Sequence, residues 1–318
     1  MRGPKHKYTN PGSAAAWMWL LAACAAFLGN TDAAAQQDLA PPTIRTVRIT
    51  DSLYMLVGNG GNIGLSVGSD GALLVDDQFA MTTDAVLAAV DEVSDGGVRL
   101  VINTHWHGDH TGGNENLSRA GAIIVAHDNV RERMSREVYL PLFDSRTPPA
   151  PAAALPVVTF SSDTTLHWNG ETIHVIHVPN AHTDSDSIVH FVDSNVIHMG
   201  DTLWTSGYPR IDSDAAGGGS VQGMIDAVEK AMSLANDETQ FIPGHGDLPE
   251  RGTAFLEEYV SMLRTIQERV RGLIEQGLSE EAVVAAEPTR EFDERWGGGY
   301  MSPEQFTRVV YRSLAGER

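Results

Sequence analysis

The chain has 318 residues, of which 42% are hydrophobic and 20% charged, and its 22 basic and 42 acidic side chains give a formal net charge of −20. This composition is typical of a globular protein and excludes a disordered, collagen-like or coiled-coil chain. Because a chain this acidic is poorly suited to neutralise phosphates, we expect no nucleic-acid partner. Its single cysteine excludes an intramolecular disulfide.

The N-terminal segment has the pattern of an export signal. Residues 1–13 contain three lysine or arginine side chains and no acid, and residues 14–28 form an uncharged apolar run of fifteen. Such a run is short for a membrane span but has the length of a secretory signal core. We therefore expect a signal peptide over residues 1–35, cleavage near Ala35, and a periplasmic or secreted protein.

An alternative N-terminal processing concerns Cys24. The residues from Leu21 to Cys24 resemble a bacterial lipobox, whose cysteine is lipidated after cleavage. The apolar residues continue beyond the cysteine to Leu28, which favours ordinary cleavage near Ala35. A lipid anchor at Cys24 stays open as the alternative, and we expect no membrane span elsewhere in the chain.

Short apolar runs separated by glycine and aspartate turns predict β-strands along the rest of the chain. We expect them at 44–50, 53–58, 63–68, 72–77, 99–104, 122–127, 157–160, 164–168, 171–178, 187–192, 195–199 and 239–242. Helical or amphipathic patterns stand at 83–93, 128–138, 220–235 and 251–275, with a broken helical pattern at 279–316. Prolines in residues 141–156 predict an exposed loop or lid without regular structure.

The most informative segment is 104–110, where a strand runs directly into a histidine-rich loop. His105 and His107 still follow the alternation of the strand and so point the same way. Asp109 and His110 can swing to an adjacent point as the chain turns. Four ligand-type side chains within six residues would stay unsatisfied in a core without a cation. Imidazole and carboxylate together suit zinc, with iron or manganese as competitors.

Three later residues have the same character, namely His182, Asp201 and His245. Each directly follows a predicted strand, and each is flanked by Gly, Pro or Asn, which permit a tight approach of backbone and side chain. Taken singly, each fits a turn residue better than a ligand. Together with the first cluster they bring the candidate ligands to seven, the number that fills two metal sites.

This ordered set, HxHxDH followed by a lone His, Gly-Asp and Gly-His, resembles the ligand set of the metallo-β-lactamase superfamily. The resemblance covers residues 45–260 and implies an α/β fold, a four-layer αββα sandwich with the site at one edge between the sheets. It implies that His105, His107 and His182 hold one metal, and that Asp109, His110 and His245 hold the other. Asp201 would bridge the two metals, and Asp76 would orient ligands from behind them.

The resemblance also sets the expected domain organisation. A signal peptide at 1–35 precedes a metallo-β-lactamase-like catalytic domain at 36–260. Residues 261–318 are expected to form a C-terminal helical extension that packs on the same domain.

A centre of this kind predicts hydrolysis. Two metals about 3.5–4 Å apart can share a hydroxide, and zinc lowers the pKa of bound water from 15.7 to about 7. No serine or cysteine nucleophile is then needed, and Asp109 is placed to orient the hydroxide and pass a proton. The bridging aspartate is typical of the glyoxalase II, lactonase and cyclase-like branches. We therefore expect cleavage of an ester, lactone, thioester or amide bond in a small molecule.

Of the residues that follow the Gly-Asp pair, three are expected to contact that substrate. Trp204 and Tyr208 would line its wall, and Arg210 would anchor an anionic group. The packing of aromatic side chains and an ordinary exposed arginine are the alternatives for these positions.

Other activities of the same fold stay open. Against a β-lactamase, one subclass has cysteine at the position of Asp201 and a lysine at the position of Trp204, and another has serine instead of the bridging aspartate. Against a non-haem iron oxidoreductase, the di-iron branch has an acid at the position of His107. A non-catalytic metal-binding protein is the third alternative, although such descendants typically lose ligands and none is missing here.

Overall fold

The structure is a computed structural model that describes residues 42–214 and 216–316. The expected signal peptide and Cys24 lie outside the described residues. In the part of the chain that is described, no helix combines the length and the apolar character that crossing a membrane requires.

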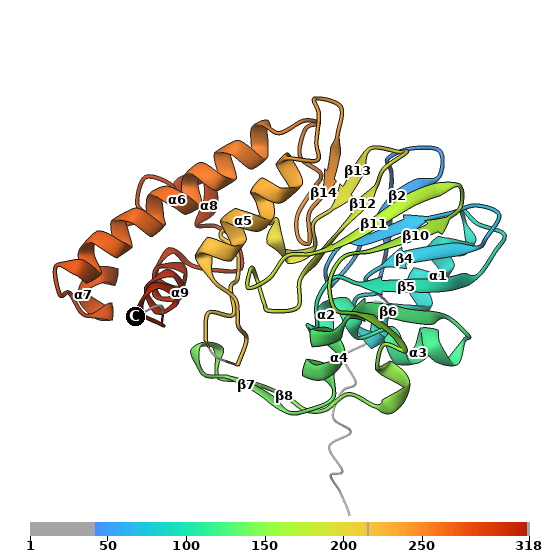
Figure 1. Cartoon of the computed structure of the whole chain (residues 1–318), viewed down its shortest axis with the longest axis horizontal. Helices are drawn as coiled ribbons and strands as arrows, with labels where there is room; N and C mark the ends of the chain where they lie inside the picture. The colour runs from blue at the N-terminus through green and yellow to red at the C-terminus, as the bar shows by residue number, and fades with distance from the viewer. Residues whose placement is uncertain (1–41, 215, 317–318) are drawn as a thin grey trace, which may run out of the picture. The chain divides into compact units, whose positions relative to one another are not determined.

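The N-terminal half of the described chain forms a seven-stranded sheet in the order β1-β2-β3-β4-β5-β6-β9 (Figure 1). Its strands are β1 (Arg45–Arg48), β2 (Leu53–Val57), β3 (Ile63–Ser66), β4 (Ala72–Val75), β5 (Val98–Asn103), β6 (Ile123–His127) and β9 (Val158–Phe160). Neighbours from β1 to β4 pair antiparallel, whereas β4, β5, β6 and β9 run parallel. The parallel strands therefore all end at the same edge of the sheet.

The second sheet has five strands in the order β10-β11-β12-β13-β14. They are β10 (Thr164–Trp168), β11 (Glu171–His177), β12 (Ser187–Phe191), β13 (Val196–His198) and β14 (Gln240–Ile242). The first four pair antiparallel, and β14 adds in parallel to β13. Both sheets are thus mixed, and β13 and β14 also end side by side.

Three apolar clusters define four layers. Side chains of both sheets, among them Leu73, Ile102, Val189 and Phe191, fill the space between the sheets. The other face of the first sheet packs on α1 (Thr83–Asp91) and α3 (Asn114–Arg119). The other face of the second sheet packs on the helices that follow it. The expected αββα fold is confirmed.

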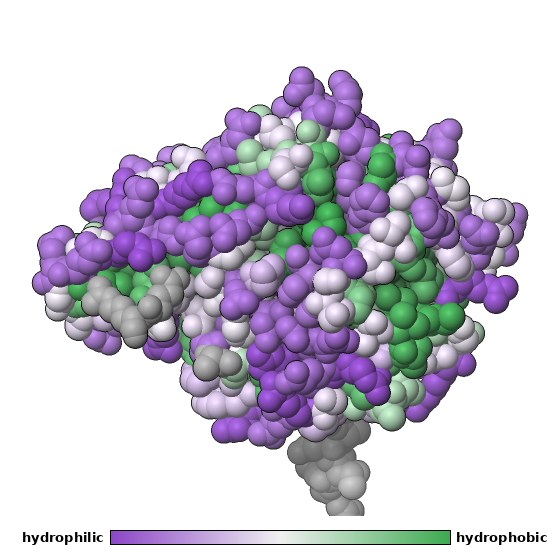
Figure 2. Space-filling model, in the orientation of Figure 1, coloured by the Kyte–Doolittle hydropathy of each residue, from purple (hydrophilic) through white to green (hydrophobic). Residues whose placement is uncertain are grey.

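The helices over the second sheet come from the last hundred residues (Figure 1). They are α5 (Val221–Met232), α6 (Ala254–Glu275), α7 (Glu280–Ala285), α8 (Asp293–Trp296) and α9 (Pro303–Gly316). The long helix α6 is amphipathic: apolar side chains such as Leu263 and Ile266 enter the core, and Figure 2 shows hydrophilic residues over its outer side. The boundary expected between residues 260 and 261 falls inside this helix.

The remaining elements lie around the site-bearing edge. They are α2 (Gly108–Thr111), α4 (Asp128–Met134), β7 (Val138–Leu140), β8 (Ser145–Thr147) and the 3-10 turns η1 (Ala80–Thr82), η2 (Pro141–Phe143), η3 (Ala152–Ala154) and η4 (Gly200–Thr202). Strands β7 and β8 pair only with each other, as a hairpin. The expectation that residues 141–156 lack regular structure is therefore wrong for this hairpin, because the prolines lie in and around the turns and not in β8.

Candidate metal centre

The ends of five strands bring the candidate ligands together. His105 follows β5, Asp76 follows β4, and Asp201 and His245 follow the neighbouring strands β13 and β14. His182 comes from the connection after β11, which reaches the same edge between the sheets. Short loops at the ends of buried strands hold these side chains on a rigid frame.

The first cluster consists of His105, His107, His182 and Asp201, all of them buried. One ligand atom from each lies within 4.8 Å of the others. His107 Nδ1 and His182 Nε2 are 2.9 Å apart, and Asp201 Oδ2 is 3.5 Å from His182 Nε2 and 3.9 Å from His105 Nε2.

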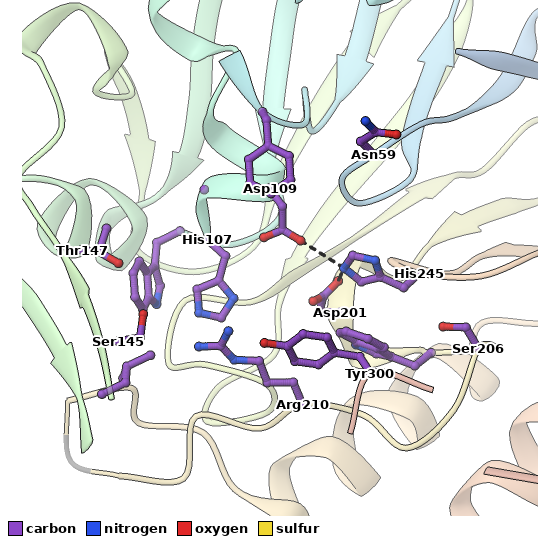
Figure 3. A pocket seen from close by; sticks show the side chains of 15 residues that line it. Asn59, His107, Asp109, Ser145, Thr147, Asp201, Ser206, Arg210, His245 and Tyr300 are labelled. Carbon is purple, nitrogen blue, oxygen red and sulfur yellow. Dashed lines mark ion pairs between the residues drawn. The ribbon is translucent and has the colours of Figure 1, made fainter. Parts of the chain in front are cut away.

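The second cluster consists of Asp109, His110 and His245 and lies closer to solvent. His245 Nε2 is 3.2 Å from Asp109 Oδ2 and 3.4 Å from His110 Nε2. Figure 3 shows the Asp109 and His245 side chains pointing toward one another over Asp201.

Asp201 lies between the two clusters. Its Oδ2 faces the first cluster, while its Oδ1 is 3.1 Å from His110 Nε2 and 3.5 Å from His245 Nε2. The two oxygens of one carboxylate are thus directed at different groups of ligands. A carboxylate in this position could bridge two metal ions, the role that the resemblance implies for Asp201.

Asp76 organises the ligands from behind. Its Oδ1 accepts a hydrogen bond from the Thr104 backbone N–H (2.7 Å), and its Oδ2 accepts from Thr104 Oγ1 (2.7 Å) and His110 Nδ1 (2.8 Å). Because the Thr104 hydroxyl donates to Asp76, it accepts from His105 Nδ1 at 3.0 Å. His105 Nε2 is left without a hydrogen-bond partner in the described part of the chain, and His110 Nε2 faces Asp201 Oδ1, so Asp76 lies where it can orient both imidazole rings.

Two further acceptors orient the other buried histidines. His107 Nε2 donates to Asp212 Oδ2 at 2.7 Å, and His182 Nδ1 donates to the Arg210 carbonyl oxygen at 2.7 Å. Asp212 could not be singled out from the sequence, because it lies in an irregular loop and not at a strand end. The available signal in the sequence was that Asp212 is an acidic residue two positions after Arg210, a candidate substrate contact.

Burial and neighbouring charges shift the pKa values of the site residues in different directions. Burial lowers the pKa of His105 well below its usual range and that of His182 to about 4, which favours the neutral imidazole that metals bind. Burial alone would raise the pKa of Asp201, but the charges of His110 and His245 outweigh it and hold that pKa well below its usual range. The pKa of His245 rises to about 9 because the nearby Asp201 and Asp109 carboxylates overcome its burial.

The clusters fit metal ions on two structural grounds. First, His105 Nε2 is buried and has no hydrogen-bond partner in the described part of the chain, which is costly unless a cation takes it. Second, Gly244 leaves room for the carboxylate, since a Cβ there would stand 2.1 Å from Asp201 Oδ1. The buried clusters are consistent with a dinuclear metal site.

A cavity of about 530 Å³ opens over the second cluster. Asp109 and His245 form part of its floor, and Trp204 and Arg210 also line it. Further lining residues come from the β7-β8 hairpin and from Tyr300 near the C-terminus (Figure 3). Residues 141–156 were expected to form an exposed loop or lid, whereas Tyr300 was not expected at the site, because nothing in the sequence links it to the candidate ligands.

Tyr208 corrects one expectation. Its side chain is fully buried, stacks on Phe306 and donates a hydrogen bond to Asp293 Oδ1 at 2.9 Å. It therefore packs on the C-terminal helices and does not line the cavity. The tyrosine that lines the cavity is Tyr300, whose segment is bridged to Tyr208 through Met301.

Replacing Asp212 by asparagine is expected to lower kcat/KM and metal affinity by about 10–100-fold, the usual cost of losing an outer-shell partner. The amide keeps the shape but can present its NH₂ group to His107 Nε2, which destabilises the productive tautomer. Metal titration and kinetics of the variant test this. Asp214→Asn is the matched control, because among the described residues Asp214 Oδ1 accepts from the backbone N–H groups of Ala216 and Gly217, and an amide oxygen can do the same. Equal effects of both substitutions would contradict the role of Asp212.

The αββα fold and the paired His/Asp clusters define a metal-dependent hydrolase. The family model described as the metallo-beta-lactamase superfamily matches residues 56–245, and the chain belongs to that superfamily.

Two curated relatives are hydroxyacylglutathione hydrolases. The chain is 28% identical over 214 residues to that of Methylococcus capsulatus, which covers 64% of this chain and 74% of the relative. It is 26% identical over 151 residues to that of Nitrosococcus oceani, which covers 46% of this chain and 48% of the relative. The match thus spans about half the length of the latter protein.

Solved structures share the fold. A metallo-beta-lactamase from Pontibacter korlensis superposes with a TM-score of 0.55 at 18% identity, covering 70% of this chain and 99% of its own. The sec-alkylsulfatase Pisa1 from Pseudomonas sp. gives a TM-score of 0.64 at 17% identity, covering 86% of this chain and 51% of its own.

Proposed function

We propose that this protein is an exported dinuclear zinc hydrolase that cleaves an ester, thioester, lactone or amide bond of a small molecule. One observation carries the proposal: four buried histidines each donate one ring N–H to the protein and present the other nitrogen to a centre around Asp201. Such fixed tautomers are typical of metal ligands. The names of the two curated relatives support a thioester as the first substrate to try.

The protein's own groups supply positioning. When bound, the metal ions supply Lewis-acid polarisation and a water of lowered pKa. Asp109 lines the cavity with its side chain 27% exposed, and the charge of His110 and the hydrogen bond from His245 hold its pKa below its usual range in spite of its burial. Its carboxylate therefore stays ionised and can accept a hydrogen bond from the attacking water, which orients that water. Trp204, packed on His245 with ring centroids 4.2 Å apart, limits the space open to the scissile bond.

Export is part of the proposal. The basic start, the fifteen-residue apolar run and the alanines before Gln36 support a cleaved signal peptide. A lipid anchor at Cys24 is the other outcome, and the mass of the mature N-terminus separates the two.

The test is metal content per chain, measured on protein purified from the periplasm without chelator, with the mature N-terminus read from the same sample. Hydrolysis of a glutathione thioester, an acyl-homoserine lactone and nitrocefin is measured alongside. We expect about two zinc ions per chain, one preferred substrate, and loss of activity with a chelator that zinc restores.

Other outcomes would change the assignment. Preference for nitrocefin would make the protein a β-lactamase, which is still a hydrolase of this class. Bound iron with oxygen uptake and without hydrolysis would overturn the proposal in favour of a redox enzyme. Two bound zincs without turnover of any ester, lactone, thioester or amide would favour a metal-binding protein.

A further inference from the structure

Arg210 brings a fixed positive charge to the wall of the cavity. Its Nε donates to Asp212 Oδ1 at 2.9 Å, and its Cζ lies 4.2 Å from the centre of the Phe143 ring. One edge of the guanidinium is thus tied to Asp212 and one face is covered by an aromatic ring, although the side chain stays 18% exposed. A side chain held in this way loses little further conformational entropy on binding a ligand.

The outer edge of the same guanidinium is available to a ligand. A guanidinium carries five N–H donors, and only the one on Nε has a hydrogen-bond acceptor among the described residues. Nη1 and Nη2 together form the fork that matches the two oxygens of a carboxylate. In Figure 3 this end of Arg210 lies between Tyr300 and Ser145, below His107.

Away from the His/Asp clusters, the other side chains of the wall are apolar or neutral. Phe79, Trp204 and Tyr300 present aromatic surface, and Ser145 and Thr147 of the hairpin present hydroxyl groups. Arg210 is the one lysine or arginine among the described residues that line the cavity. The carboxylates that reach the cavity, Asp109 and Asp201, both belong to the ligand clusters and do not pair with it.

We propose that the substrate carries a carboxylate group that the Nη1–Nη2 edge of Arg210 binds, with its apolar part against Phe79, Trp204 and Tyr300. This inference rests on the proposed function, because it concerns the substrate of the same site. A monocarboxylate fits better than a larger anion, since Asp212 already balances part of the charge and only one edge of the guanidinium is open.

Binding of a substrate-shaped ketone tests this without any turnover. We choose 4-benzoylbutyrate and its neutral amide, 4-benzoylbutyramide, titrated calorimetrically into the metal-loaded protein. The carboxylate is expected to bind about tenfold more tightly or better, as a charge-assisted bidentate hydrogen bond requires. Arg210→Gln is expected to remove this preference, and Arg210→Lys to keep part of it, because an ammonium retains the charge without the fork.

A matched control separates direct contact from general attraction. Arg146 lies on β8 between Ser145 and Thr147, but it does not line the cavity and its side chain is 60% exposed. Arg146→Gln removes one positive charge nearby and is expected to keep the preference within about twofold, since exposed charges are well screened. Metal content is checked in every variant. The Arg210 carbonyl that orients His182 is backbone and survives the substitutions.

Hydrolysis gives the second readout, with mono-(4-nitrophenyl) glutarate and 4-nitrophenyl 4-carbamoylbutanoate as the charged and neutral esters. The ratio of their kcat/KM values is expected to be about ten or more and to fall to about one in Arg210→Gln. Equal binding of the carboxylate and the amide, or a preference that survives in Arg210→Gln, would overturn the inference. Preferential binding of the carboxylate with neither ester cleaved would support it and count against the proposed hydrolysis alone.

Discussion

Asp201→Asn is expected to lower kcat/KM by more than about 100-fold and bound metal from about two ions per chain to about one or fewer, because losing a ligand costs more than the 10–100-fold of an outer-shell change. The two oxygens of Asp201 face different clusters, so its neutralisation weakens both. An amide also turns one of these positions into an N–H donor, which repels a cation. Metal analysis together with kinetics measures the effect.

Asp109→Asn is the comparison for this experiment. Asp109 belongs to the second cluster only, so its substitution should leave the first cluster able to hold about one ion. The two variants are expected to differ in metal content more than in activity. If Asp201→Asn kept two ions per chain and activity within about tenfold of the original, the bridging position would be refuted.

Asp76→Asn is expected to lower the free energy of unfolding by about 2–4 kcal/mol and to weaken metal binding as well. The buried carboxyl group accepts three hydrogen bonds, two from Thr104 and one from His110. In asparagine an NH₂ group replaces one of the two oxygens, and the hydrogen bonds to that oxygen are lost because an amide nitrogen does not accept hydrogen bonds. Backbone strain does not contribute, because Asp76 has a φ of 65° and asparagine tolerates this left-handed region well. Urea unfolding of the metal-free protein measures the change.

The neighbouring Asp77 provides the control for this prediction. It is also buried, but within residues 42–214 and 216–316 only its Oδ1 has a hydrogen-bond partner, the Gly113 N–H, and burial raises the pKa of its carboxyl group. An amide therefore resembles the neutral acid and keeps the accepting oxygen. Asp77→Asn is expected to change stability by less than about 1 kcal/mol. Similar losses in the two variants would show that burial, and not the Thr104–His110 network, sets the cost.

The parts of the site that follow local rules could be predicted from the sequence. His105 and His107 stand at the end of an apolar strand, and alternation places them on one side. The later residues His182, Asp201 and His245 could be placed because strands that run together end together. The structure brings all seven candidate ligands into two adjacent clusters.

The substrate wall could not be predicted in the same way. Tyr208 was expected there because it is aromatic and near Asp201, but packing against Phe306 and the hydrogen bond to Asp293 draw it into the helical layer. These contacts join residues about eighty or more positions apart, which no local pattern reveals. The role of Asp212 could not be predicted for a related reason, because its hydrogen-bond partner His107 is 105 positions away in the sequence.

The cavity wall and the His/Asp clusters come largely from different segments, so mutations can change the wall without changing the clusters. The hairpin β7-β8 and the segment around Tyr300 line the cavity without donating a metal ligand, and the hairpin pairs with neither main sheet. Mutations in these two stretches can reshape what enters the cavity while the donor atoms stay where they are. Proteins with this fold can therefore change substrate preference in evolution while they keep the residues of the metal centre. A laboratory library of variants restricted to residues 138–147 and 300 would use the same separation.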